Sequence, residues 1–152
     1  MTSAVARLAW ERGRRWLESG RRALTDRRWD DAVYAAQMAS EQAAKGLLLA
    51  AGIEVPKQHD VSNLLLDLGM EPGRSFARDE LEEVARIVAD LASRRALAAY
   101  GFESEVGVEE FRAVAPRAVR EAARVVGFVR AALGLAGRAG PRARPSHRGR
   151  SR

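Results

Sequence analysis

Residues 81–101 read LEEVARIVADLASRRALAAYG and form a strongly amphipathic helical pattern. Apolar residues recur at steps of three and four, which is the spacing of one helix face: Leu81, Val84, Ala85, Val88, Leu91 and Ala92. The next position on that face is Arg95. A guanidinium is costly to bury without an anionic partner. Arg95 therefore either reaches a carboxylate or points into a groove that accepts a phosphate or another anion.

Helical patterns dominate the chain on both sides of this segment. We expect long helices over about 3–25, 29–51, 78–100 and 108–133, and a short helix over 61–68. Gly52 and Pro56 end the second helix, and Asp60 is a candidate N-cap of the short one. Pro116 should either kink the last helix or mark a late start. The predicted fold class is all-α, a four-helix up-and-down antiparallel bundle with an additional short helix.

The composition excludes several kinds of site. The chain has 152 residues, 47% of them apolar, which is enough for one modest core. Cysteine is absent, so disulfides and thiolate metal sites are excluded. His59 and His147 are the only histidines, so we expect no metal and no cofactor. No apolar run approaches the roughly 18 residues of a membrane span, and residues 1–10 do not resemble a signal peptide. We therefore expect a cytoplasmic protein without a membrane partner.

The net charge of +6 comes from the C-terminal segment. Residues 138–152 hold six arginines and no acid, which leaves equal numbers of basic and acidic residues in the rest of the chain. Because this segment is also rich in Gly, Pro and Ser, we expect a disordered basic tail at 137–152 and a folded domain at 1–136. Such a tail is either an electrostatic arm for nucleic acid or a solvated extension without a specific role.

The second predicted helix is rich in alanine and almost entirely small or apolar from residue 32 to 51. Its exceptions include Gln37, Glu41 and Lys45, which are spaced by four and form one polar line. Glu41 and Lys45 are either an ordinary surface pair or part of a site. A bundle this short cannot easily surround such a helix, so we expect the second subunit of a homodimer to cover part of it.

Several segments together resemble the front half of a HEPN domain. They are YAAQMASEQAAKGLL at 34–48, then Gly52, KQHDV at 57–61 and the pair Leu64-Leu65. An arginine-bearing long helix and a final helix follow in similar order, so the resemblance covers about residues 4–133. It implies a four-helix bundle with an extra short helix, usually a homodimer, often accompanied in prokaryotes by a minimal nucleotidyltransferase in a toxin–antitoxin pair. Many such domains are metal-independent ribonucleases, and others bind nucleotides or RNA without cleaving them.

The family's hallmark, an arginine followed after four to six residues by histidine, is incomplete here. Tyr100 stands in the histidine's place, with four residues between it and Arg95 and five between it and Arg94. Arginine suits phosphate binding through its fixed fork of donors, whereas tyrosine is a poor base at neutral pH. The pattern therefore favours anion binding over cleavage. His59 lies at a predicted helix start, where a capping or packing role is more common than catalysis.

These observations predict a dimer that binds RNA, a nucleotide or a partner nucleotidyltransferase through an inter-subunit groove. The candidate ligand residues are Arg94, Arg95, Tyr100, Glu41 and Lys45, the last two because they match the family's Glu-x3-Lys/Arg feature. The first alternative is a metal-independent ribonuclease toxin in which Arg95 and Tyr100 are the candidate catalytic residues. The second alternative is a structural helical adaptor without a ligand site.

Overall fold

The computed structural model describes residues 3–73 and 76–135, and every regular element in those ranges is helical. The elements are α1 (Ala4–Thr25), α2 (Trp29–Ala50), α3 (Ser62–Gly69), α4 (Arg78–Tyr100), the short 3-10 helices η1 (Gly101–Ser104) and η2 (Val108–Phe111), and α5 (Ala115–Ala132). The predicted all-α bundle with an additional short helix, α3, is confirmed. Within the described ranges no helix is long and apolar enough to cross a membrane. The predicted tail at 137–152, with His147, lies outside the described residues.

The ends of the first two helices follow from local sequence signals. Ser3 caps α1, and its hydroxyl accepts a hydrogen bond from the backbone N–H of Ala6 at 3.2 Å. After α2, Gly52 adopts a φ of 77°, a left-handed conformation that glycine accepts without steric cost. The chain then turns so that the N–H of Ile53 donates to the carbonyl of Leu48 at 3.0 Å, which satisfies the helix end.

Two later helix starts refine the sequence-based boundaries. The predicted N-cap of the short helix is wrong by one residue, because α3 begins at Ser62 and Val61 is its N-cap. The carboxylate of Asp60 still accepts the backbone N–H of Ser62 at 2.9 Å. The last long helix begins at Ala115, so Pro116 marks a late start rather than a kink. Proline is tolerated there because the N–H groups in the first turn of a helix have no acceptor within the helix, so the N–H that proline lacks costs no hydrogen bond.

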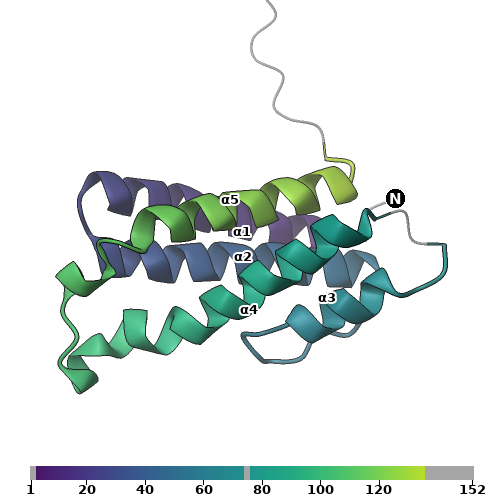
Figure 1. Cartoon of the computed structure of the whole chain (residues 1–152). Helices are drawn as coiled ribbons and strands as arrows, with labels where there is room; N and C mark the ends of the chain where they lie inside the picture. Colours follow the sequence, from purple (N-terminus) through teal and green to yellow (C-terminus); the bar gives the residue numbers. More distant parts are fainter. Residues whose placement is uncertain (1–2, 74–75, 136–152) are drawn as a thin grey trace, which may run out of the picture.

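α2 lies at the centre of the bundle (Figure 1). The short turn at 26–28 returns the chain along α1, and α4 and α5 also pack on α2. The alanines of α2 allow this close approach, and five of them have no exposed surface: Ala32, Ala36, Ala39, Ala43 and Ala44. A single chain therefore covers α2. α1, α4 and α5 already bury most of this helix, so the expected homodimer stays a prediction that does not follow from the burial of α2.

Two glycines bring the α1 and α2 backbones into contact. A methyl group built on Gly13 would lie 2.8 Å from the carbonyl oxygen of Ala39 and 2.9 Å from the backbone nitrogen of Ala43. One built on Gly46 would lie 2.9 Å from the carbonyl oxygen of Ala6. These distances are shorter than van der Waals contact, so only glycine fits at either position without moving a helix. The tight pair of α1 and α2 is the base on which α4 and α5 pack.

Replacing Gly13 with alanine should destabilise the fold by about 1–3 kcal/mol, because the added methyl pushes α1 away from α2. Gly127 on α5 is the matched control, since a methyl group there meets no atom within 4 Å. Gly127→Ala should be neutral or stabilise by up to about 1 kcal/mol through helix propensity. Urea unfolding followed by circular dichroism measures both changes. Equal effects of the two substitutions would contradict the close packing of α1 on α2.

Candidate functional site

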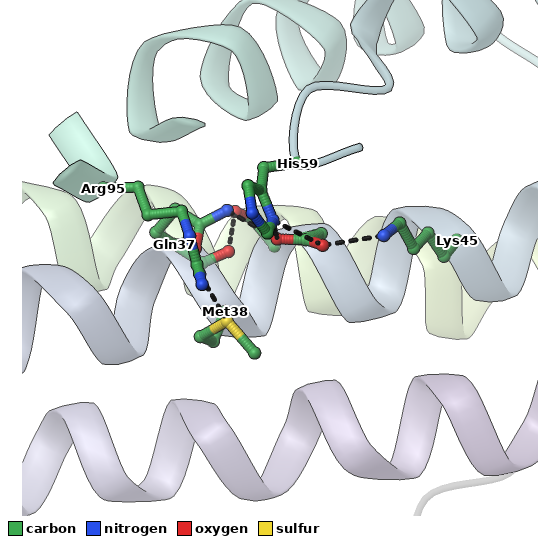
Figure 2. A network of polar contacts seen from close by, with 7 residues as sticks. Gln37, Met38, Lys45, His59 and Arg95 are labelled. Carbon is green, nitrogen blue, oxygen red and sulfur yellow. Dashed lines mark hydrogen bonds and ion pairs between the residues drawn. The ribbon is translucent and has the colours of Figure 1, made fainter. Parts of the chain in front are cut away.

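Arg95 extends from α4 to α2, and its guanidinium meets three neutral groups. Its Nη1 donates to the side-chain oxygen of Gln37 at 2.9 Å and to the sulfur of Met38 at 3.0 Å. Its guanidinium carbon lies 5.1 Å from the centre of the Tyr34 ring, within the range of a cation–π contact. Figure 2 shows Arg95 beside Gln37 and Met38. Among the described residues no carboxylate contacts Arg95, so its charge is held in place without being neutralised.

Gln37 links Arg95 to a buried carboxylate. The residue is 1% exposed, its oxygen accepts from Arg95, and its nitrogen donates to Oε2 of Glu41 at 2.8 Å. Because only the amide nitrogen can donate and only the oxygen can accept, these two contacts fix the orientation of the amide. Arg95 and Glu41 are therefore connected through a neutral bridge instead of forming a direct ion pair.

Glu41 is the centre of the network. It is 3% exposed, its Oε1 accepts a hydrogen bond from Nζ of Lys45 at 2.7 Å, and His59 approaches the same carboxylate. Burial raises the pKa of the Glu41 carboxyl, but the hydrogen bonds from Lys45 and Gln37, the Lys45 charge and the His59 contact outweigh burial and hold the pKa below its ordinary value. The Lys45 side chain is only 18% exposed, so this is not an ordinary surface pair.

His59 reaches the network from the loop between α2 and α3 (Figure 2). Its position in the sequence favoured capping or packing at a helix start, but the capping contact there comes from Asp60. Nδ1 of His59 instead lies 3.3 Å from Oε1 and 3.2 Å from Oε2 of Glu41, and its side chain is 56% exposed. Periodicity could not reveal a contact between residues 18 apart across a loop. The one sequence signal was the place of His59 in the KQHDV segment.

The other two predicted site residues lie outside this network. Arg94 is exposed, and Tyr100 is 59% exposed and packs edge-on against Phe102 with 6.2 Å between the ring centres. Five residues along an α-helix correspond to a rotation of about 140°, so Arg95 and Tyr100 leave α4 on different faces. The predicted site residues that lie together in the network are Glu41, Lys45 and Arg95.

The network presents cationic donors around a buried anion. The described contacts of Arg95 use Nη1 and the guanidinium face, so within that part of the chain the edge formed by Nε and Nη2 has no protein acceptor. This edge carries two parallel N–H donors, a geometry that matches a phosphate or carboxylate. No group of three or more His, Cys, Asp or Glu residues in the described ranges is placed to hold a metal ion. The arrangement suits the binding of an anion by charge and hydrogen bonds.

We expect Glu41→Gln to lower the free energy of unfolding at neutral pH by about 1–3 kcal/mol, because the poorly solvated Lys45 loses its counter-ion. The pKa of Glu41 is depressed in the folded chain, so its stabilising contribution is complete above the ordinary value of 4.5 and is lost as the pH falls through the lower folded value. The stability difference between wild type and variant should therefore shrink below that pH. Urea unfolding at a series of pH values measures it, and a pH-independent difference would contradict the network.

Comparison with known proteins agrees with this architecture. Among solved structures, the chain is similar to the crystal structure of TT1696 from Thermus thermophilus, with 27% sequence identity and a TM-score of 0.68. The similarity covers 87% of this chain and 99% of that one. No curated protein matches the chain. A family model described as the HEPN domain matches residues 6–132, which run from the first turns of α1 to the end of α5, and so the chain belongs to the HEPN domain family.

Proposed function

We propose that this HEPN domain binds RNA through its phosphate backbone, with Arg95 as the principal contact. The observation that carries the proposal is the state of the Arg95 guanidinium. It is held by Gln37, Met38 and the Tyr34 ring, all of them neutral, and its Nε–Nη2 edge has no acceptor among the described residues. An arginine that is fixed in position but not neutralised attracts a phosphate with little loss of side-chain entropy on binding.

The surroundings of Arg95 support an extended ligand. Lys45 is paired with Glu41, so Arg95 supplies the uncompensated charge of the network, and the exposed Arg94 next to it adds to the positive potential. An RNA strand that binds at Arg95 and continues toward the end of α4 passes the exposed ring of Tyr100. A base of that RNA can stack on the ring. A free nucleotide would use the same phosphate contact without the Tyr100 contact. The structural adaptor alternative gives no reason for an arginine held in this way.

We also propose that the domain forms a homodimer, supported by a surface other than α2. Three large apolar side chains are exposed beside Tyr100, where α4 ends and η1 and η2 follow: Leu97, Phe102 and Val108. We call this set the α4-end patch. Exposed apolar side chains gathered at one end of a small domain are typical of an interaction surface. A second copy on this patch would place two Arg94 and Arg95 pairs on either side of one groove.

Arg95→Ala should weaken RNA binding about tenfold or more, because a charge-assisted hydrogen bond to phosphate contributes about 1.5–3 kcal/mol. The slope of log affinity against log salt should also flatten by about 0.7 for each phosphate of a single strand that the variant no longer binds. Fluorescence anisotropy with a labelled single-stranded RNA at several salt concentrations measures both quantities. Competition by unlabelled mononucleotides tests whether the ligand is a strand or a free nucleotide.

The matched control for this measurement is Arg15→Ala. Arg15 is an exposed arginine on α1 without a side-chain partner in the described ranges, so the substitution removes the same charge from a different helix. Its effect on affinity should be less than about threefold. If Arg15→Ala and Arg95→Ala lower the RNA affinity equally, the binding is nonspecific charge attraction. That result would contradict a site at Arg95.

Sedimentation should give about twice the chain mass of 16.6 kDa at micromolar concentration. Phe102→Glu should shift the protein to the monomer, because Phe102 is 72% exposed within the α4-end patch and a buried glutamate is costly in an interface. Val5→Glu on α1 is the control, since Val5 is 60% exposed outside the patch. A wild type that sediments as a monomer, or a Phe102→Glu variant that stays a dimer, would contradict the α4-end patch as the dimer interface.

A further inference from the structure

The contact that holds Arg95 over an aromatic ring occurs a second time, on α1. The guanidinium carbon of Arg12 lies 5.0 Å from the centre of the Trp16 ring, and that of Arg95 lies 5.1 Å from the centre of the Tyr34 ring. The two rings meet edge to face, with 6.0 Å between their centres. Arg12, Trp16, Tyr34 and Arg95 therefore form one continuous row across α1, α2 and α4, which we call the arginine–aromatic row.

Arg12, like Arg95, is held in place without being neutralised. α1 contains six arginines and two glutamates. Both glutamates pair with other arginines, Glu11 with Arg7 at 3.1 Å and Glu18 with Arg14 at 2.5 Å. Among the described residues no carboxylate contacts Arg12, and the residue is exposed. Its planar group of donors is therefore open to an anion from outside the chain.

The row also fixes how far apart its two cations lie. Its three steps of 5.0, 6.0 and 5.1 Å place the guanidinium carbons of Arg12 and Arg95 at most about 16 Å apart. In Figure 2 the Arg95 side chain extends across α2 toward Met38, on the side of α2 where α1 runs. The phosphates of one strand in a regular helix follow each other at about 3.4 Å along the axis, so a few nucleotides span this distance.

We propose that Arg12 is a second phosphate contact and that the ligand is a single RNA strand that crosses α2 from Arg95 to Arg12. The inference rests on the proposed function, because Arg95 supplies the first contact. Tyr100 lies farther along α4, and the arginine–aromatic row leads from Arg95 in another direction, toward α1. Arg95 would thus lie within the path of the strand and Arg12 toward one end of it.

The surface beside the two rings favours unpaired bases. Trp16 and Tyr34 line a surface hollow of about 370 Å³ between α1 and α2. Arg22 lines the same hollow and has no side-chain partner in the described part of the chain. A base of a single strand can turn away from its neighbours and enter such a hollow beside aromatic rings, whereas the bases of a duplex are held by pairing and stacking. The proposed ligand is therefore single-stranded.

The test measures fluorescence anisotropy of the full chain with a labelled single-stranded RNA of about 12 nucleotides. Arg12→Ala should weaken binding about tenfold and flatten the slope of log affinity against log salt by about 0.7, because one phosphate contact is lost. Arg15→Ala is the matched control, since Arg15 is an exposed arginine of the same helix without an aromatic contact in the described ranges. It should weaken binding less than about threefold. Equal losses for the two variants would overturn the contact at Arg12.

Two further variants separate the charge of Arg12 from the ring that holds it. Arg12→Lys should keep the wild-type salt slope and recover only part of the affinity, because lysine keeps the charge but lacks the planar fork. Trp16→Leu, with its folding checked by circular dichroism, should weaken binding about threefold without changing the slope, because Arg12 must then be ordered as the RNA binds. A flattened slope for Arg12→Lys would contradict a role for its charge.

A dinucleotide with a single phosphate, used as an unlabelled competitor, tests the order of the two contacts. Its affinity should fall with Arg95→Ala and stay unchanged with Arg12→Ala, because the two rings lie between the two guanidinium groups. Equal sensitivity of the dinucleotide to both substitutions would overturn separate phosphate contacts.

Other outcomes distinguish this inference from the proposed function. A long strand whose affinity falls with Arg95→Ala but not with Arg12→Ala overturns the second contact and leaves RNA binding at Arg95 standing. A duplex of the same sequence that binds as tightly as the single strand overturns the assignment of a single-stranded ligand. A wild-type chain that does not bind RNA overturns the proposed function, and the further inference with it.

Discussion

A carboxylate that is 3% exposed has lost nearly all its water, and the site depends on how Glu41 replaces that water. Its partners come from the same helix and from the loop that follows it: Lys45, Gln37 and His59. Each partner is then fixed in turn, because leaving Glu41 unsatisfied would cost more than ordering the side chain. The loop before α3 is tied to α2 through His59, and Gln37 is oriented toward α4. The buried charge therefore organises its surroundings as much as it is stabilised by them.

The small residues of α2 make this arrangement possible. With fully buried alanines and the close approach at Gly13 and Gly46, three long helices pack against one. A helix surrounded in this way has little surface left for solvated charges, so Gln37 and Glu41 are buried although they are polar. α4 also comes near enough for the Arg95 side chain to reach Gln37. Tight packing and the polar network are thus two results of the same alanine-rich sequence.

The sequence predicted the helices well, because periodicity and capping are local properties. It also predicted the Glu41–Lys45 pair and the unusual position of Arg95, since both follow from helical spacing. It did not predict the Arg95–Gln37 contact, which joins residues 58 apart on different helices, or the His59–Glu41 contact across a loop. The alanine-rich pattern also could not show that one chain buries most of α2 without a second subunit. Single-helix patterns do not reveal how many neighbours one chain can bring to a helix.

The fixed amide of Gln37 has an evolutionary consequence. Its nitrogen donates a hydrogen bond to Glu41 and its oxygen accepts one from Arg95. The residue therefore separates a negative from a positive charge by one neutral group. Glutamate has the same shape and differs from glutamine by a single base in the codon. A lineage that acquired it would place an anion directly against the arginine and neutralise it, and Glu41 would lose a hydrogen-bond donor and face a second carboxylate. Under the proposed function, position 37 is thus a point at which the anion site can be lost, or regained, in a single mutational step.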